Sequence, residues 1–316
     1  MKPNISAGCD VVIPTAGSLD LLRPCLQSLA AQTAPHRVIL VDDGPEPGVS
    51  AAIGREHPRV NVIRHPPKGG FAASVNAGIA AGDADVVVLL NDDVTPEPPF
   101  LEALLEPLRT EPSVAMVAAL LLRPDGRVDS FGLEADPTLA AFPRLSGEAV
   151  EELPSESDGV LGPAGAAGAY RREAISSVGG LDEGLVSYNE DADLALRMRA
   201  AGWTCAVAPE ARGVHLGSAT FGHRSSPQLY RLGFSRGYML RKYRVLNSPG
   251  RALRAISSEL ASIGWQIVKA RDLAGLRGRI AGWRSGRPEI SLPRELLSES
   301  ITVADGIARR RALHGR

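Results

Sequence analysis

The chain of 316 residues has few cysteines and no long apolar run. Its three cysteines, Cys9, Cys25 and Cys205, lie far apart and form no Cys-x-x-Cys pair, so neither a disulfide framework nor a zinc site is indicated. No apolar stretch reaches the roughly 18 to 20 residues that a membrane-spanning helix needs. The first ten residues lack the basic and apolar regions of a signal peptide. We therefore expect a soluble, cytoplasmic protein.

An excess of charge of one sign is also absent. The formal net charge is −1, which gives no overall indication of a nucleic-acid partner. Two phosphate-binding fingerprints are missing as well. The segment after the first strand-like run, residues 14–18, reads PTAGS, which is neither the G-x-G-x-x-G of dinucleotide-binding proteins nor the G-K-[ST] of a P-loop. At 44% hydrophobic and 22% charged residues, the composition is that of a globular protein.

What the first half does contain is a regular alternation of strand-like and helix-like segments. Strand-like runs cover residues 9–15, 36–44, 60–66, 84–93 and 114–122, and segments with helical spacing lie between them. Strands separated by helices of this length predict βαβ units and a mostly parallel sheet flanked by helices. The fold class is therefore α/β, with a Rossmann-like arrangement.

The second half is less regular. It begins with a hairpin predicted over 123–132, followed by helical spacing over 164–183 and 189–203, and by a late edge strand over 204–217. After about residue 221 the sequence becomes rich in arginine and has the spacing of helices. We predict an α/β domain over residues 1–222 and a helical region over 223–316.

The helical region allows two interpretations. Trp265 and Trp283 lie among arginines on helix-like segments, as in a surface helix that contacts anionic lipid at the membrane periphery and brings a lipid-linked acceptor close. The alternative is an appendage that covers the sheet or forms a homodimer interface. We favour the second on the sequence alone.

Polar residues end several of the strand-like runs. Asp42–Asp43 end the second run and Asn91–Asp93 end the fourth. Because ligands bind at the carboxyl ends of parallel strands, we expect a shared acidic pocket, with a simple Asp-Gly turn as the alternative for Asp42–Gly44. Carboxylates repel phosphates unless a hard divalent cation bridges them. The pattern favours a nucleotide with its base and ribose near Asp42–Asp43 and its diphosphate on Asp93 through a metal.

A second acidic group opens a helix-like segment much later. Three acids lie within Glu190–Asp193. Helix capping and an ion pair of Asp193 with Arg197 one turn on explain part of this group, and one remaining carboxylate could act as a general base. His215 follows the late strand. A lone histidine is more often a core or surface group, but its imidazole suits Mn²⁺ as a second donor.

Taken together, the motifs resemble a known family. In chain order they are VVIPTAG, VILVDDG, GFAASVNAGI, VVLLNDDV, VGGLDEGLVSYNEDADLALRMRAAGW and VHLGSAT. They resemble inverting family 2 glycosyltransferases of the GT-A fold, and most closely the rhamnosyltransferase-like branch, over roughly residues 8 to 220. Residues 1–222 would then form the nucleotide-sugar-binding and catalytic domain.

The resemblance implies roles for individual residues. Asp191 would be the catalytic base, with Glu190 as a second candidate, and Asp93 with His215 would bind Mn²⁺ or Mg²⁺. One departure is Lys68, which stands where the family often has asparagine. The implied nucleotide contacts are Pro14, Thr15, Asp42, Asp43, Lys68, Asn76, Asn91 and Asp92. The implied acceptor and donor pocket contains Gly165, Ala166, Tyr170 and Arg236.

The implied reaction is transfer of one sugar from a nucleoside-diphosphate sugar, with dTDP-rhamnose as the suggested donor, to a hydroxyl of a glycan, lipid-linked or small-molecule acceptor. The Gln-x-x-Arg-Trp signature of processive synthases is absent. Three alternatives are a sugar-nucleotide pyrophosphorylase, a non-enzymatic sugar-nucleotide-binding protein and a glycosidase. A pyrophosphorylase needs a glycine-rich basic loop after the first strand, which this chain lacks. A protein that only binds the sugar nucleotide would be expected to lose Asp93 or Asp191, and both are present. A glycosidase has no use for a nucleotide pocket.

Overall fold

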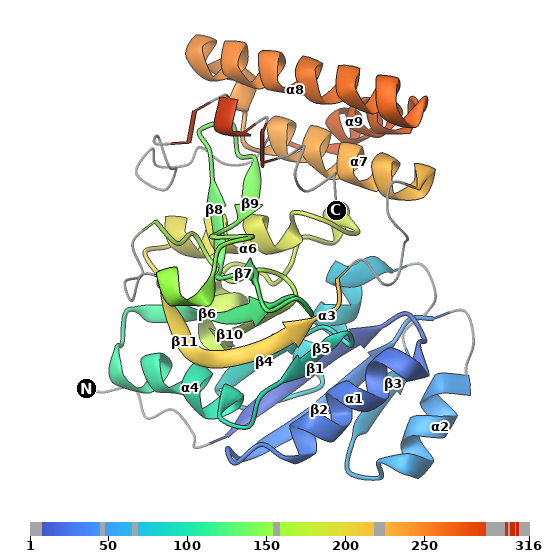
Figure 1. Cartoon of the computed structure of the whole chain (residues 1–316), viewed down its shortest axis with the longest axis vertical. Coiled ribbons are helices and arrows are strands. Elements are labelled where there is room, and N and C mark those ends of the chain that lie inside the picture. The colour runs from blue at the N-terminus through green and yellow to red at the C-terminus, as the bar shows by residue number, and fades with distance from the viewer. Residues whose placement is uncertain are drawn as a thin grey trace.

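The computed structural model describes residues 8–44, 48–64, 69–153, 159–217 and 225–288, together with most of 301–309. One curled sheet organises the first two thirds of the chain (Figure 1). Its strands, in spatial order, are β3 (Asn61–Arg64), β2 (His36–Asp42), β1 (Cys9–Thr15), β4 (Val86–Leu90), β10 (Ala167–Arg171), β6 (Val114–Leu122), β11 (Thr204–His215) and β5 (Val94–Pro96). Strand β7 (Val128–Ser130) pairs with β6, and β8 (Leu133–Ala135) with β9 (Ala141–Pro143) forms a separate hairpin.

The sheet is mostly parallel, which confirms the predicted α/β class. Strand β1 pairs in parallel with both β2 and β4, and β6 pairs in parallel with β11. Strand β10 is inserted antiparallel between β4 and β6. Two details of the prediction are wrong. Residues 167–171 form this strand instead of a helix, and β11 lies inside the sheet because β5 pairs with its outer side. The predicted hairpin over 123–132 is confirmed by β6 and β7.

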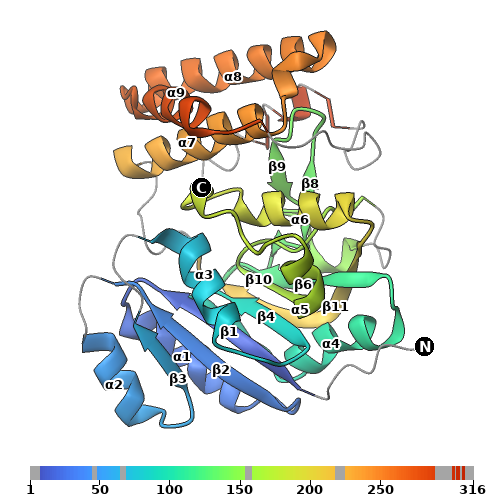
Figure 2. The same cartoon turned by 180° about the vertical axis from the view of Figure 1, so that it is seen from behind.

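Helices cover both faces of the sheet, as Figures 1 and 2 show. On one face lie α1 (Leu19–Ala30), α2 (Gly48–Glu56) and α4 (Phe100–Thr110), and on the other α3 (Gly70–Ala80), α5 (Arg172–Ser177) and α6 (Glu190–Ala200). Successive strand residues point to opposite faces, so Val11 and Ile13 pack with α1 whereas Val12 packs with α3. Strands β1, β4 and β6 are buried on both sides along almost their whole length, which explains their nearly continuous apolar sequences.

Three helices form a layer beyond α6: α7 (Ser226–Lys242), α8 (Pro249–Ala270) and α9 (Ala274–Ser285). Helix α7 lies between α6 and α8 in both views (Figures 1 and 2). The predicted boundary at residues 222 and 223 falls outside the described residues. Across the described ranges, none of the helices combines the length and apolar character needed to cross a membrane.

Helices α7 and α9 pack through glycines. A Cβ added at Gly278 of α9 would overlap the Tyr230 carbonyl of α7, and one added at Gly237 of α7 would overlap the Arg279 carbonyl of α9. Glycine therefore lets the two backbones approach closely. We expect Gly278→Ala to lower the free energy of unfolding by about 1 to 3 kcal/mol, because the inserted methyl group forces the helices apart. Urea unfolding measures this loss.

The matched control is Gly264→Ala on α8. Gly264 is also inside a helix, but a Cβ there would meet no atom within 4 Å. This change should stabilise the protein by about 0.5 to 1 kcal/mol, since alanine loses less backbone entropy than glycine. Equal effects of the two substitutions would contradict the close packing of α7 on α9.

Candidate active site

The carboxyl ends of β1 and β4 meet through a buried hydrogen bond. Thr15, the last residue of β1, donates from its hydroxyl to Asp92 Oδ2 at 2.6 Å. Burial raises the pKa of Asp92 to about 6, against the Thr15 hydrogen bond, and the nearby charges of Asp93 and Asp43 add to the increase. These carboxylates therefore lie close enough to repel one another. Pro14 precedes Thr15 on β1, opposite Val41 of β2.

Two aspartates follow β2, and the structure separates their environments. Asp42 is fully buried, and its carboxylate contacts Arg64 Nη1 at 2.7 Å, the Gly44 amide at 3.0 Å and the Ser50 hydroxyl. Protein groups thus occupy both of its oxygens. Asp43 is only half-buried and, among the described residues, accepts a hydrogen bond from Ser74 Oγ at 3.2 Å. Asp43 is the better placed of the two for an external hydroxyl.

Asp93 and His215 come together because β5 pairs with β11. The register places His215 opposite Val94, and His215 Nε2 lies 3.4 Å from Asp93 Oδ1. The other ring nitrogen, Nδ1, lies 2.8 Å from Asp129 Oδ2. Burial alone would lower the pKa of His215, but the contacts with Asp129 and Asp93 raise it to about 9.

A divalent cation fits this arrangement once His215 has lost its proton, because the neutral imidazole is the metal ligand. Asp93 Oδ1 is buried and receives no hydrogen bond from the described residues. With Asp129 holding Nδ1, the other imidazole nitrogen points to Asp93, and such carboxylate–histidine pairs orient metal ligands. The described chain contains no group of three His, Cys, Asp or Glu side chains able to hold a metal. An ion here would need further oxygens from substrate or water, as is usual for Mg²⁺.

The start of α6 carries the second acidic pair. Asp191 Oδ2 accepts from the Gly165 amide at 2.8 Å, and Oδ1 accepts from the Ala192 amide at 2.7 Å. Burial raises the pKa of Asp191 against these two hydrogen bonds. Burial also raises the pKa of Glu190 to about 8, and the charge of Asp191 adds to this. Tyr170 of β10 is buried nearby, where burial and then the Asp191 charge raise its pKa.

A short segment connects the two acidic groups. The Gly165 amide binds Asp191, and the carbonyl of the next residue, Ala166, accepts from the Asn91 amide at 2.8 Å. A Cβ at Gly165 would lie 3.1 Å from Asp191 Oδ2, so glycine allows this close approach. The base candidate and the Asn91–Asp93 turn therefore flank the same two residues.

The loop before α6 has an unusual backbone. Val186, Tyr188 and Asn189 have φ angles of 49°, 71° and 63°, in the left-handed region that non-glycine residues rarely adopt. Asn189 Nδ2 donates to Ser235 Oγ of α7 at 2.9 Å. Such strain persists only where surrounding contacts hold it, and it is concentrated at functional sites. The loop thus sets how the first turn of α6, with Glu190 and Asp191, is oriented.

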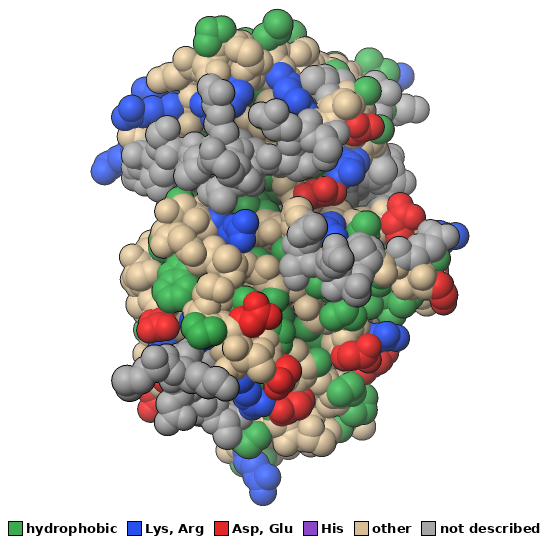
Figure 3. Space-filling model, turned by 90° about the vertical axis from the view of Figure 1, so that its left-hand side faces the viewer, with side chains coloured by type: hydrophobic (Ala, Val, Ile, Leu, Met, Phe, Trp, Pro, Cys, Tyr) green, Lys and Arg blue, Asp and Glu red, His purple; other side chains and the backbone are tan. Residues whose placement is uncertain are grey.

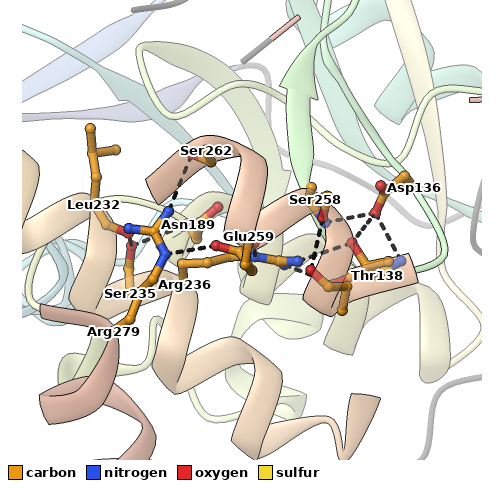
Figure 4. A network of polar contacts seen from close by, with 12 residues as sticks. Asp136, Thr138, Asn189, Leu232, Ser235, Arg236, Ser258, Glu259, Ser262 and Arg279 are labelled. Atoms are coloured by element: carbon orange, nitrogen blue, oxygen red, sulfur yellow. Dashed lines mark hydrogen bonds and ion pairs between the residues drawn. The ribbon is translucent and has the colours of Figure 1, made fainter. Parts of the chain in front are cut away.

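Other expected site residues have partners inside the protein. Asn76 holds the loop before α6, with Nδ2 donating to the Leu181 carbonyl and Oδ1 accepting from the Leu181 amide, both at 2.9 Å. Arg236 is buried and donates to Glu259 Oε1 at 2.7 Å and to the Thr138 carbonyl at 2.8 Å (Figure 4). These contacts do not support the predicted role of Asn76 in nucleotide binding or that of Arg236 in the acceptor and donor pocket. Lys68 lies outside the described residues.

Sequence reasoning missed Asp129. It was part of a predicted hairpin and carried no sign of chemistry, since its partner His215 lies 86 residues further along the chain. No local sequence pattern predicts a contact between residues so far apart in the chain.

Two of the curated relatives that the chain matches are named as glycosyltransferases. The chain is 34% identical over 212 residues to a pre-mycofactocin glycosyltransferase of Mycobacterium tuberculosis, covering 65% of the chain and 42% of the relative. It is 30% identical over 214 residues to an N-acetylglucosaminyl-diphospho-decaprenol L-rhamnosyltransferase of the same organism, covering 60% and 70%. The chain spans less than half of the length of several curated relatives that it matches.

Solved structures extend the comparison to the fold. GalNAc-T7, in a structure with UDP, GalNAc and Mn²⁺, superposes with a TM-score of 0.59 at 14% identity, covering 90% of the chain and 55% of that protein. The mannosyltransferase PcManGT of Pyrobaculum calidifontis, with GDP-Man and Mn²⁺, gives 0.54 at 17%, covering 97% and 83%. At these identities the likeness shows the fold, which is that of GT-A glycosyltransferases. The family model described as glycosyl transferase family 2 matches residues 10–179, more than half of the chain, and the chain therefore belongs to that family.

Proposed function

We propose that the chain transfers one sugar from a nucleoside-diphosphate sugar to an acceptor hydroxyl, with inversion and with a divalent cation. The observation that carries this proposal is the Gly165–Ala166 segment, which is hydrogen-bonded to Asp191 on one side and to Asn91 on the other. It brings a candidate base and the acidic turn of β4 to one place. A single displacement needs both, because the base activates the acceptor while the leaving diphosphate departs on the opposite side.

Asp191 suits the role of the base. The Gly165 and Ala192 amides hold both of its carboxylate oxygens, and burial raises its pKa above the ordinary value for aspartate. A higher pKa makes the carboxylate a stronger base toward the proton of the acceptor hydroxyl. Burial and the neighbouring Asp191 charge raise the pKa of Glu190 as well, but its buried Oε2 receives no hydrogen bond from the described residues. Asp191 is therefore the carboxylate whose two oxygens are both held in place.

Asp93 and His215 would hold the cation. When bound, the cation supplies neutralisation of the charge that develops on the leaving diphosphate. Asp129 keeps the His215 ring in one orientation through Nδ1. Around them, the half-buried Asp43 would accept hydrogen bonds from the ribose or base, and Thr15 fixes Asp92 beside it.

For the donor we propose dTDP-rhamnose. Its support is the L-rhamnosyltransferase among the relatives. The fold alone does not choose, since its neighbours were solved with UDP and with GDP-Man. A lipid-linked molecule, a glycan or a small molecule would each supply the hydroxyl group that attacks the sugar.

The test is a donor panel of dTDP-, UDP- and GDP-sugars with and without Mn²⁺. Thermal stability should rise most with dTDP-rhamnose plus Mn²⁺, because a ligand that binds only the folded state stabilises it by mass action. Slow Mn²⁺-dependent release of dTDP in the presence of water or an added acceptor should follow. Binding without any release of nucleoside diphosphate would favour a sugar-nucleotide-binding protein. Production of dTTP on addition of pyrophosphate would favour a pyrophosphorylase.

A further inference from the structure

Helix α8 directs four polar side chains into the protein. Ser258, Glu259, Ser262 and Gln266 are all buried. Glu259 accepts from Arg236 of α7 and from Arg279 of α9, both at 2.7 Å, as Figure 4 shows. This polar network fills the space between α8 and the rest of the helical layer. Hydrogen bonds and ion pairs thus join the inner side of α8 to α7 and α9.

The opposite side of α8 is apolar and exposed to solvent. We name it the outer face of α8, formed by Leu253, Ile256, Leu260, Ile267 and Val268. Leu253, Leu260 and Val268 are 73%, 65% and 74% exposed. Their spacing of three, four and seven or eight residues places them on one side of the helix. Hydrophobic side chains stand at the top of the molecule in Figure 3, with lysines and arginines below them.

This polarity is the reverse of that of a helix on a water-soluble domain, which turns its apolar stripe to the core. Ten large hydrophobic side chains are exposed in the described chain, and seven of them lie on α8, on α9 or between the two. Exposed apolar surface gathered in one place marks a site of interaction. The outer face of α8 therefore needs a partner.

The excess of positive charge around the outer face of α8 indicates the kind of partner. Residues 225–288 contain thirteen Lys and Arg but only two Asp and Glu, in a chain of net charge −1. Both acids are engaged, Glu259 with arginines and Asp272 with Ser226. Exposed Arg271, and Arg277 and Arg284 on α9, accompany the apolar residues. A second copy of the chain would bring two such cationic surfaces together, whereas the buried centre of an interface is depleted in charge.

We propose that the outer face of α8 docks on an anionic lipid membrane, with α8 lying in the plane of the lipid headgroups. The apolar side chains enter the boundary between headgroups and acyl chains, and the arginines pair with lipid phosphates. This binding is peripheral. It rests on the surface of α8 and α9 alone and does not depend on the proposed sugar transfer.

Co-sedimentation of the full chain with vesicles tests the proposal. The protein should sediment with vesicles of phosphatidylcholine and phosphatidylglycerol, and much less with phosphatidylcholine alone. The variant Leu253→Ser/Leu260→Ser/Val268→Ser should bind anionic vesicles more weakly by on the order of a hundredfold, because three apolar side chains no longer leave water. All three residues are largely exposed, so its circular dichroism and unfolding midpoint should match those of the wild type.

The control variant is Tyr230→Ser on α7. Tyr230 is 40% exposed but lies outside the outer face of α8, so vesicle binding should stay unchanged. Absence of binding to anionic vesicles would overturn the proposal, as would equal binding by the triple variant. Sedimentation velocity without lipid gives a third outcome. A dimer that the triple variant dissociates would assign the outer face of α8 to a second copy and would likewise overturn it.

Discussion

Replacing Asp191 by asparagine will remove nearly all sugar transfer while nucleotide binding stays almost unchanged. Asparagine has the same shape and still accepts a hydrogen bond from the Gly165 or Ala192 amide, but its amide accepts no proton from the acceptor hydroxyl. General base catalysis contributes typically about 10²–10⁴-fold, so transfer should fall by about a hundred- to ten-thousandfold. Product formation measures the loss, and calorimetric titration with the nucleoside diphosphate measures the binding.

Glu190→Gln is the matched control. It removes the neighbouring carboxyl, which lies within the same helical turn and has a pKa of about 8, without removing the proposed base. Transfer should therefore persist within a fewfold of the wild type at neutral pH. The opposite result, with activity lost in Glu190→Gln and kept in Asp191→Asn, would move the role of the base to Glu190. Loss of nucleotide affinity with transfer retained in Asp191→Asn would refute the assignment outright.

The sheet was predictable because its strands have a strong local signal. Apolar runs such as 86–90 and 114–122 are buried on both faces, and the residues between them have helical spacing. Strand β10 was missed for a physical reason. Its sequence, Ala-Gly-Ala-Tyr-Arg, lacks the β-branched residues typical of strands. The strand is fixed by hydrogen bonds to β4 and β6 on either side, and these exist only in the folded protein.

The same reasoning separates the predictable part of the site from the rest. Acidic residues at the ends of strands can be recognised in the sequence, and Thr15 does contact Asp92 in the structure. Asp42 is different, because only the fold reveals that Arg64 and Ser50 occupy its carboxylate. The polarity of α8 was also hidden. Its apolar and polar residues were visible in the sequence, but which of the two sides faces inward depends on where Arg236 and Arg279 meet Glu259.

Replacing Asp93 by asparagine should remove the effect of Mn²⁺ on nucleotide binding. Its buried Oδ1 lacks a hydrogen bond from the described residues and faces His215 at 3.4 Å, so the substitution takes a negative charge from the proposed cation site while preserving shape. In the wild type, Mn²⁺ should tighten nucleoside-diphosphate binding strongly, because the cation offsets repulsion between carboxylate and phosphate. In Asp93→Asn the titrations with and without Mn²⁺ should coincide, and transfer should fall by about a hundredfold or more.

Asp129→Asn provides the graded comparison for Asp93. Asp129 contacts His215 Nδ1 at 2.8 Å and would act on the cation only through the ring that it orients. Losing such an outer partner typically costs about 10- to 100-fold in metal affinity, so Mn²⁺ should still bind, but more weakly. Electron paramagnetic resonance of free Mn²⁺, with the nucleoside diphosphate present, ranks the three proteins independently of turnover. The order wild type, Asp129→Asn, Asp93→Asn is expected. Mn²⁺ binding to Asp93→Asn with wild-type affinity would place the cation elsewhere and leave Asp93 without a role in it.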